Sequence, residues 1–223
     1  MFAYSLSPFA AALLALIAAG FCVEAARRAR WSAPVGDHLR WALATVFALL
    51  GQRMAVQLDS GLTLHFLAAA FLALLLGYPR ALLSMALVLA VDLVLPSPGE
   101  PADFAALAGW GPRTLLGAVL PIWTMWLVVW ACRRWLPRNP FVFLLGCGLF
   151  GLFVSYVAQL VATAAVYAAL TPELPRGFTE DFFPYALLLA TGEAWLEGML
   201  TTLLVVYVPG SVRLFDEGFY LGR

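Results

Sequence analysis

The chain has 223 residues, of which 63% are hydrophobic and only 12% are charged, and its mean hydropathy is +0.90. Soluble globular domains carry about 25% charged residues, so the composition excludes a soluble globule and indicates an integral membrane protein in contact with lipid. The 13 acidic residues balance 13 basic ones, all arginines, and without a basic excess no nucleic-acid partner is expected. Spans of about 20 residues would use most of this length, which predicts a single transmembrane domain over residues 1–223.

Apolar segments follow one another along the chain, separated by prolines, glycines and charges that end helices or mark loops. We expect them at about residues 8–26, 39–57, 61–78, 81–96, 114–135, 141–170 and 184–208. Backbone groups in hydrocarbon need partners within their own segment, so these segments should be helices. The predicted fold is therefore all-α: a polytopic membrane protein with about seven transmembrane helices. The short link Gly77-Tyr-Pro-Arg80 makes segments three and four a tight hairpin.

The arginines divide unequally between the two predicted sides of the membrane. One side holds Arg53, Arg113 and Arg176, and the other holds the remaining ten, which are Arg27, Arg28, Arg30, Arg40, Arg80, Arg133, Arg134, Arg138, Arg213 and Arg223. Cytoplasmic loops carry an excess of Arg and Lys. The bias predicts that the N-terminus lies outside and the C-terminus inside.

Five ionisable residues lie in or beside the predicted spans: Asp59, His65, Asp92, Glu193 and Glu197. Such residues are costly in a membrane, so each is either satisfied by a partner or lines a functional cavity. The predicted topology places the first four in the outer part of the membrane and Glu197 nearer its centre. They therefore gather toward one side.

Glu193 and Glu197, four residues apart, project from one helix face and would repel each other if both were ionised. Three solutions remain open: one is protonated, Arg53 pairs with one of them, or a cation binds there. His65 could form a hydrogen bond between helices, or it could join the amine of Met1 and the carboxylates in a site for a first-row divalent metal. No P-loop is present, so active transport would need another subunit to supply energy.

Small residues cluster in the sixth predicted segment, where Gly146, Gly148 and Gly151 follow at short intervals. Glycines at such spacing let neighbouring helices approach closely. We expect this segment to pack tightly against other spans; a helix that flexes during transport is the alternative.

Several stretches together resemble a known family. They are Gly61-Leu-Thr-Leu-His65, the Gly77-Tyr-Pro hairpin, the loop from Gly99 to Gly109, and the last span, Gly192 to Thr202. Their order and sequence are similar to the CbiM/NikM membrane subunits, the cobalt- and nickel-binding components of energy-coupling-factor ABC transporters. The closing segment 212–220 resembles a proteobacterial branch of these subunits.

The resemblance implies a seven-helix subunit of the bacterial inner (plasma) membrane, with its N-terminus outside, that captures a divalent metal at its outer face. In that family the ligands are the terminal amine, a histidine at position two and the histidine that opens the third helix. Met1 and His65 match the first and last of these, whereas Phe2 stands in place of the second. The implied substrate is Co or Ni, and the implied partners are a transmembrane coupling subunit and ATPase subunits.

The leading hypothesis is a non-enzymatic substrate-capture (permease) subunit of an importer for a divalent transition-metal cation. Segments two, three, four and seven would form an outward-facing cavity with His65 and Met1 as metal ligands. The groups expected to support the ligands or compensate the charge are Asp59, Glu193, Glu197, Asp92 and Arg53.

Two alternatives remain. Phe2 favours a non-transporting membrane scaffold or assembly factor that keeps the same fold. An intramembrane enzyme would require Glu193, Glu197 and His65 to converge within roughly 4 Å of a common point.

Overall fold

A computed structural model of the chain describes residues 8–54, 56–57, 63–95, 104–170 and 182–222. This part of the chain is almost entirely helical, which confirms the predicted all-helical class. The helices are α1 (Pro8–Arg28), α2 (Val35–Arg53), α3 (Ala69–Leu76), α4 (Tyr78–Val94), η1 (Phe104–Gly109), α5 (Trp110–Thr114), η2 (Leu115–Val119), α6 (Leu120–Trp135), η3 (Val142–Gly151), α7 (Leu152–Leu170), α8 (Phe183–Tyr207), η5 (Pro209–Ser211) and α9 (Glu217–Leu221).

Each predicted apolar segment corresponds to helical structure, but the described helices differ in their capacity to cross a membrane. Four are long and apolar enough to do so alone: Pro8–Arg28, Ala106–Trp135, Val142–Val166 and Phe183–Tyr207. Helices α3 and α4 have only 8 and 17 residues. The structure thus supports a polytopic helical protein, and the count of seven crossings stays a prediction.

The second predicted segment ends earlier than expected, and the third begins its helix later than expected. Helix α2 stops at Arg53 rather than near residue 57, and the backbones of β1 (Val56–Gln57) and β2 (Thr63–Leu64) then pair in antiparallel register. Helix α3 starts at Ala69, so the expected helix is wrong over residues 63–68. The physical reason is that Thr63–Leu64 pairs with β1 and Ala68 adopts a left-handed φ of 43°, which a helix excludes.

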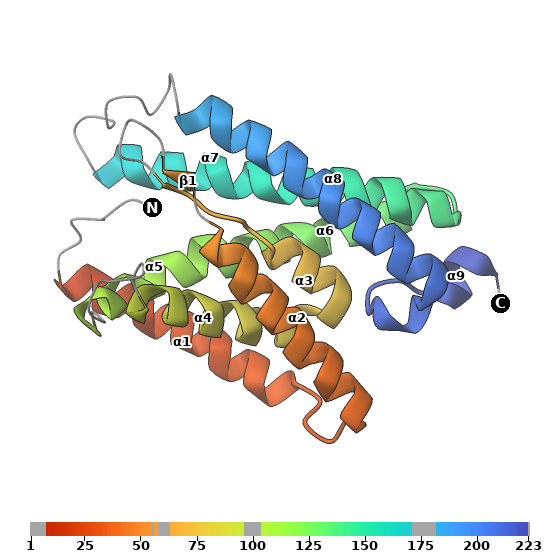
Figure 1. Cartoon of the computed structure of the whole chain (residues 1–223), viewed down its shortest axis with the longest axis horizontal. Helices are drawn as coiled ribbons and strands as arrows, with labels where there is room; N and C mark the ends of the chain where they lie inside the picture. The colour runs from red at the N-terminus through yellow and green to blue at the C-terminus, as the bar shows by residue number, and fades with distance from the viewer. Residues whose placement is uncertain (1–7, 55, 58–62, 96–103, 171–181, 223) are drawn as a thin grey trace.

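Helix α3 lies in the centre of the molecule, in contact with α2, α4, α6 and α7 (Figure 1). All but one of its residues are buried, including Phe71, Leu72 and Leu74. A helix that is apolar on every side is typical of a core position. α3 is therefore the element around which the longer helices pack.

The C-terminal segment closes the end of α3. The Arg213 and Leu214 backbone N–H groups donate to the Leu75 and Leu74 carbonyls, both at 3.1 Å. These carbonyls belong to the last turn of α3, where they have no N–H donors within their own helix. The segment is anchored by Phe215 and Tyr220, whose buried rings stack with centroids 5.6 Å apart. A distant part of the chain thus caps α3.

Glycines allow α8 and α6 to approach η3 closely. A Cβ atom added at Gly198 would lie 2.5 Å from the Gly148 carbonyl oxygen, and one at Gly151 would lie 2.9 Å from Val128 Cγ1. The close packing predicted for Gly148 and Gly151 is confirmed.

We expect Gly198→Ala to destabilise the protein, because the new methyl group meets backbone rather than a movable side chain. Overpacking of this kind costs roughly 1–3 kcal/mol. Gly192→Ala, on the same helix but with nothing within 4 Å of the added atom, should be neutral or slightly stabilising. Thermal unfolding of both variants in detergent measures the difference, and equal Tm values would contradict the prediction.

Candidate functional site

A cavity of about 90 Å³ lies between the end of α2, the turn before α3, and helices α4, η2, α7 and α8. Its polar lining consists of Gln52, His65, Tyr156, Gln159 and Thr163, and the other lining residues are apolar apart from Gly117. The predicted cavity between segments two, three, four and seven therefore has a counterpart here, with segments five and six also contributing. Its size suits a small ligand with few water molecules.

His65 enters this cavity from the non-helical turn between β2 and α3. Its Nδ1 lies 3.2 Å from the Gln52 carbonyl oxygen. A carbonyl can only accept, so Nδ1 carries the proton and the Nε2 lone pair is left for a ligand. The Gln52 carbonyl is in the last turn of α2, where it has no helical partner. The end of one helix thus fixes the tautomer of the histidine beside the next.

Glu193 of α8 forms a hydrogen bond with the same turn. Its Oε2 accepts a hydrogen bond of 2.9 Å from the Leu67 backbone N–H, and the side chain is only 2% exposed. The following residue, Ala68, has a φ of 43°, a left-handed conformation that is unusual for a residue with a Cβ. Glu193 therefore stabilises a strained break in the backbone, one helical turn from the cavity residue Ala190.

Glu197 lies one turn further along α8 and is fully buried. Its Oε2 accepts a hydrogen bond from the hydroxyl of Tyr156, a residue that also lines the cavity. Within the described ranges, Oε1 of Glu193 and Oε1 of Glu197 have no hydrogen-bond partner. Arg53 is exposed and forms no ion pair with either glutamate. Of the three solutions for the two carboxylates, the Arg53 pair is not formed.

Asp92, expected to support the ligands or compensate charge, forms an ion pair with an arginine. Its carboxylate lies 3.4 Å from Arg113 Nη1, with side-chain exposures of 10% and 19%. This largely buried ion pair joins α4 to α5, and neither of its side chains lines the cavity. Met1 and Asp59, the two other predicted site residues, lie outside the described residues.

No three His, Cys, Asp or Glu side chains within the described ranges are grouped closely enough to hold a metal ion. Glu193, Glu197 and His65 therefore do not form the convergent group that the enzyme hypothesis requires. From the described part of the chain, the cavity offers one imidazole nitrogen, amide and hydroxyl oxygens, and buried carboxylates nearby.

Sequence reasoning missed the contribution of α7 to the cavity. Tyr156, Gln159 and Thr163 are spaced three and four residues apart, so they lie on one helix face. Gln159 is 8% exposed, and its Oε1 has no partner in the described structure. Polar residues at helical spacing inside an apolar span were the available signal.

Comparison with known proteins identifies the class to which this fold and cavity belong. Residues 2–212 match the family model CbiM, described as the cobalt uptake substrate-specific transmembrane region. No curated protein sequence matches the chain. The chain belongs to the CbiM family, and its predicted class, the substrate-binding membrane component of an energy-coupling-factor type metal importer, is confirmed.

Solved structures show the same fold. One described as a transition metal transporter superposes with a TM-score of 0.66 at 19% identity, covering 94% of this chain and 92% of the other. A truncated transition metal transporter gives 0.67 at 20% identity, covering 93% and 97%. The family is one of transporter components rather than enzymes. Its description agrees with Co or Ni as a transported substrate instead of a resident cofactor.

We expect Glu193→Ala to free the turn before α3, because the Leu67 N–H would lose its acceptor in a buried place. An unsatisfied buried donor costs about 1–3 kcal/mol, so amide exchange at Leu67 should accelerate by roughly tenfold or more. Glu193→Gln keeps a carbonyl acceptor and should preserve protection. Glu197→Ala is the control on the same helix face and should leave protection at Leu67 unchanged. If Leu67 lost protection in Glu197→Ala but not in Glu193→Ala, the bond from Leu67 to Glu193 would not be what stabilises the turn.

Proposed function

We propose that this chain captures Co²⁺ or Ni²⁺ in the cavity beside His65 and releases it across the membrane when partner subunits act on it. The observation that carries the proposal is the fixed tautomer of His65. Its Nδ1 donates to the Gln52 carbonyl, and its Nε2 is left for a metal in a small cavity. Metal-binding histidines commonly have this arrangement, with the second nitrogen donating to a carbonyl.

The buried carboxylates supply charge that suits a divalent cation. Glu193 and Glu197 each bond a neutral donor through one oxygen and keep the other without a described partner. A cation in the neighbouring cavity would favour their ionised forms in this low-dielectric surrounding. We assign both a charge-compensating role. The Asp92–Arg113 pair would set the surrounding field, and Arg53, exposed at the end of α2, would act at the cavity entrance.

The remaining ligands are proposed from the family resemblance. The Met1 amine would bind the metal together with His65, and Asp59 would contribute negative charge beside it. Nitrogen donors such as an amine and an imidazole suit Co²⁺ and Ni²⁺ well.

We propose seven membrane crossings, the third of which is built in two parts. Helix α3 has 8 residues and covers about 12 Å. The non-helical residues 63–68 could add at most about 20 Å if they were fully extended, so the two together would at most approach the roughly 30 Å of the hydrocarbon core. Non-helical backbone is tolerated at membrane depth where protein encloses it. The burial of α3 and the bond from Leu67 to Glu193 fit this condition.

The arginine-rich connections meet at one end of the bundle. Arg80 donates to the Arg30 carbonyl at 2.7 Å, and Arg133 donates to the Leu214 carbonyl at 2.8 Å. Figure 1 shows the start of α1 at the opposite end of the bundle from α9. We propose that the arginine-rich end faces the cytoplasm of a bacterial inner membrane, following the positive-inside rule. A coupling subunit with its ATPases would act from that side.

Calorimetric titration of the purified full chain with Co²⁺ and Ni²⁺ tests the binding site. His65→Ala should lower the affinity by more than the roughly 10–100-fold that supporting groups contribute. His38→Ala is the matched control, because His38 is only partly exposed and lies at the arginine-rich end, with Nε2 3.1 Å from the Trp31 carbonyl oxygen. Equal affinities in the two variants, or no binding by the unaltered chain, would overturn the proposal and favour the scaffold alternative.

Cysteine labelling tests the orientation. In a background with Cys22, Cys132 and Cys147 replaced by Ala, Ala108→Cys should react with a membrane-impermeant thiol reagent added outside intact cells. Gly36→Cys should react only after the cells are opened, because it follows α1 at the arginine-rich end. Both positions have room: Ala108 is exposed, and nothing lies within 4 Å of a Cβ at Gly36. The reverse pattern would invert the topology.

A further inference from the structure

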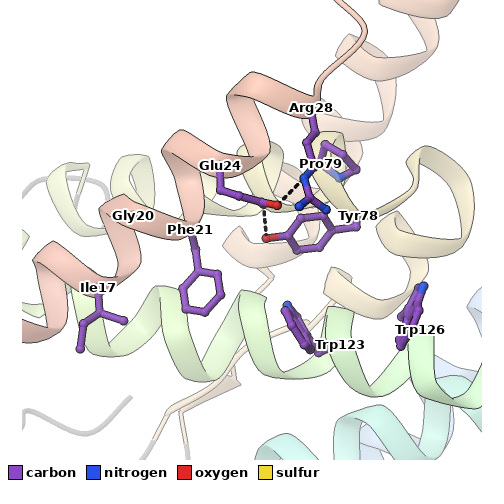
Figure 2. A pocket seen from close by; sticks show the side chains of 9 residues that line it. All are labelled: Ile17, Gly20, Phe21, Glu24, Arg28, Tyr78, Pro79, Trp123 and Trp126. Atoms are coloured by element: carbon purple, nitrogen blue, oxygen red, sulfur yellow. Dashed lines mark hydrogen bonds and ion pairs between the residues drawn. The ribbon is translucent and has the colours of Figure 1, made fainter.

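A groove far larger than the His65 cavity lies on the outside of the bundle, between α1, the start of α4 and α6. It encloses about 720 Å³ and is walled by Ile17 and Phe21 of α1 and by Trp123 and Trp126 of α6 (Figure 2). Trp123 and Trp126 are 48% and 51% exposed, and Ile17 is 43% exposed. These side chains face the region that lipid chains occupy.

One end of this groove is polar. The hydroxyl of Tyr78 donates to Glu24 Oε2 at 2.9 Å, and Arg28 Nε lies 2.5 Å from Glu24 Oε1 (Figure 2). Glu24 is thus neutralised by Arg28, and the terminal nitrogens of Arg28 make no hydrogen bond within the described structure. The groove therefore changes from apolar to polar along α1, ending at a guanidinium group.

A second, basic pocket continues from this polar end. Arg28 and Pro79 line both spaces, and the second is also lined by Arg30, Arg80 and Arg213. Its one carboxylate, Asp37, pairs with Arg40 at 3.4 Å. Arg80 is held by the Arg30 and Asp37 carbonyl oxygens and lies over the Trp41 ring, 5.1 Å from its centroid. The pocket thus carries positive charge that the described carboxylates do not balance.

We propose that this groove and basic pocket together bind one anionic phospholipid from the bilayer. The acyl chain would lie along Ile17, Phe21, Trp123 and Trp126, and the phosphate would enter the space between Arg28, Arg80 and Arg213. Arginine binds phosphate oxygens through paired N–H donors. Basic pockets between transmembrane helices bind anionic head groups on the same principle.

The dimensions agree with a lipid in one leaflet. From Ile17 to Arg28 the helix rises about 16 Å, which is close to half of the roughly 30 Å hydrocarbon core. The groove as a whole, from Ile17 to Arg28, therefore matches the depth of one leaflet, and the guanidinium groups would lie where head groups begin. A partner helix would also cover the apolar walls, but it would not require the unbalanced arginines at their end. Charge complementarity thus favours the lipid.

Native mass spectrometry of the full chain tests the proposal. The protein, stripped of lipid in detergent, is given equal amounts of phosphatidylglycerol and phosphatidylcholine. We expect one phosphatidylglycerol molecule to be retained preferentially. Arg28→Gln combined with Arg213→Gln should weaken its retention roughly 30-fold, from the loss of two arginine charges near a head group.

Two matched controls separate a site from a general surface effect. Arg27→Gln combined with Arg134→Gln removes the same charge from exposed arginines at the same end that line neither pocket, and it should leave retention near that of the unaltered chain. Gly20→Leu fills open space in the groove and should displace the lipid, whereas Gly192→Leu fills open space on α8 and should not.

Several results would overturn the proposal. These are equal retention of the two lipids by the unaltered chain, an equal loss in the Arg27/Arg134 control, and no effect of Gly20→Leu. Crosslinking between copies carrying Gly20→Cys, with no lipid retained, would show that a second protein chain covers the groove instead.

Discussion

The peptide groups at the two ends of α3 impose the constraint on which the fold depends. This short helix is buried at the centre of the bundle, where neither water nor lipid supplies partners. Before its first turn the Leu67 N–H is satisfied by Glu193 of α8, and in its last turn the Leu74 and Leu75 carbonyls are satisfied by the C-terminal segment. Distant parts of the chain thus form the hydrogen bonds that a longer helix would form within itself.

The break before α3 is also what creates the site. A continuous helix from residue 61 would use its own carbonyls and bury its side chains against neighbours. The non-helical turn instead brings His65 against the end of α2, where the free Gln52 carbonyl orients its ring. Glu193 stabilises this turn through one carboxylate oxygen, and its other oxygen has no hydrogen-bond partner among the described residues. Glu193 can thus accept a backbone hydrogen bond and also balance the charge of a bound cation.

The sequence revealed the helical class, the seven apolar segments, the glycine packing and the family, because each rests on local composition or order. It misplaced the start of α3, because the apolar sequence from Leu62 onward suggested one continuous helix, whereas Thr63–Leu64 pairs as a strand and Ala68 is left-handed. The partner of Asp92 was not predictable, because the pairing with Arg113 depends on how α4 meets α5. Gln159 and Thr163 were overlooked inside a strongly apolar span, where only their shared helix face marks them.

The capping of α3 by the C-terminal segment has a consequence for biosynthesis. Chains fold as they emerge, beginning with the N-terminal part, so α3 is made long before Arg213 and Leu214 exist. The Leu74 and Leu75 carbonyls therefore lack these partners while α6, α7 and α8 enter the membrane. The bundle can close around α3 only after residues 213–220 have left the ribosome, and Phe215 and Tyr220 then anchor this segment in the core. A protein fused to the C-terminus must therefore leave this segment free to turn back into the core.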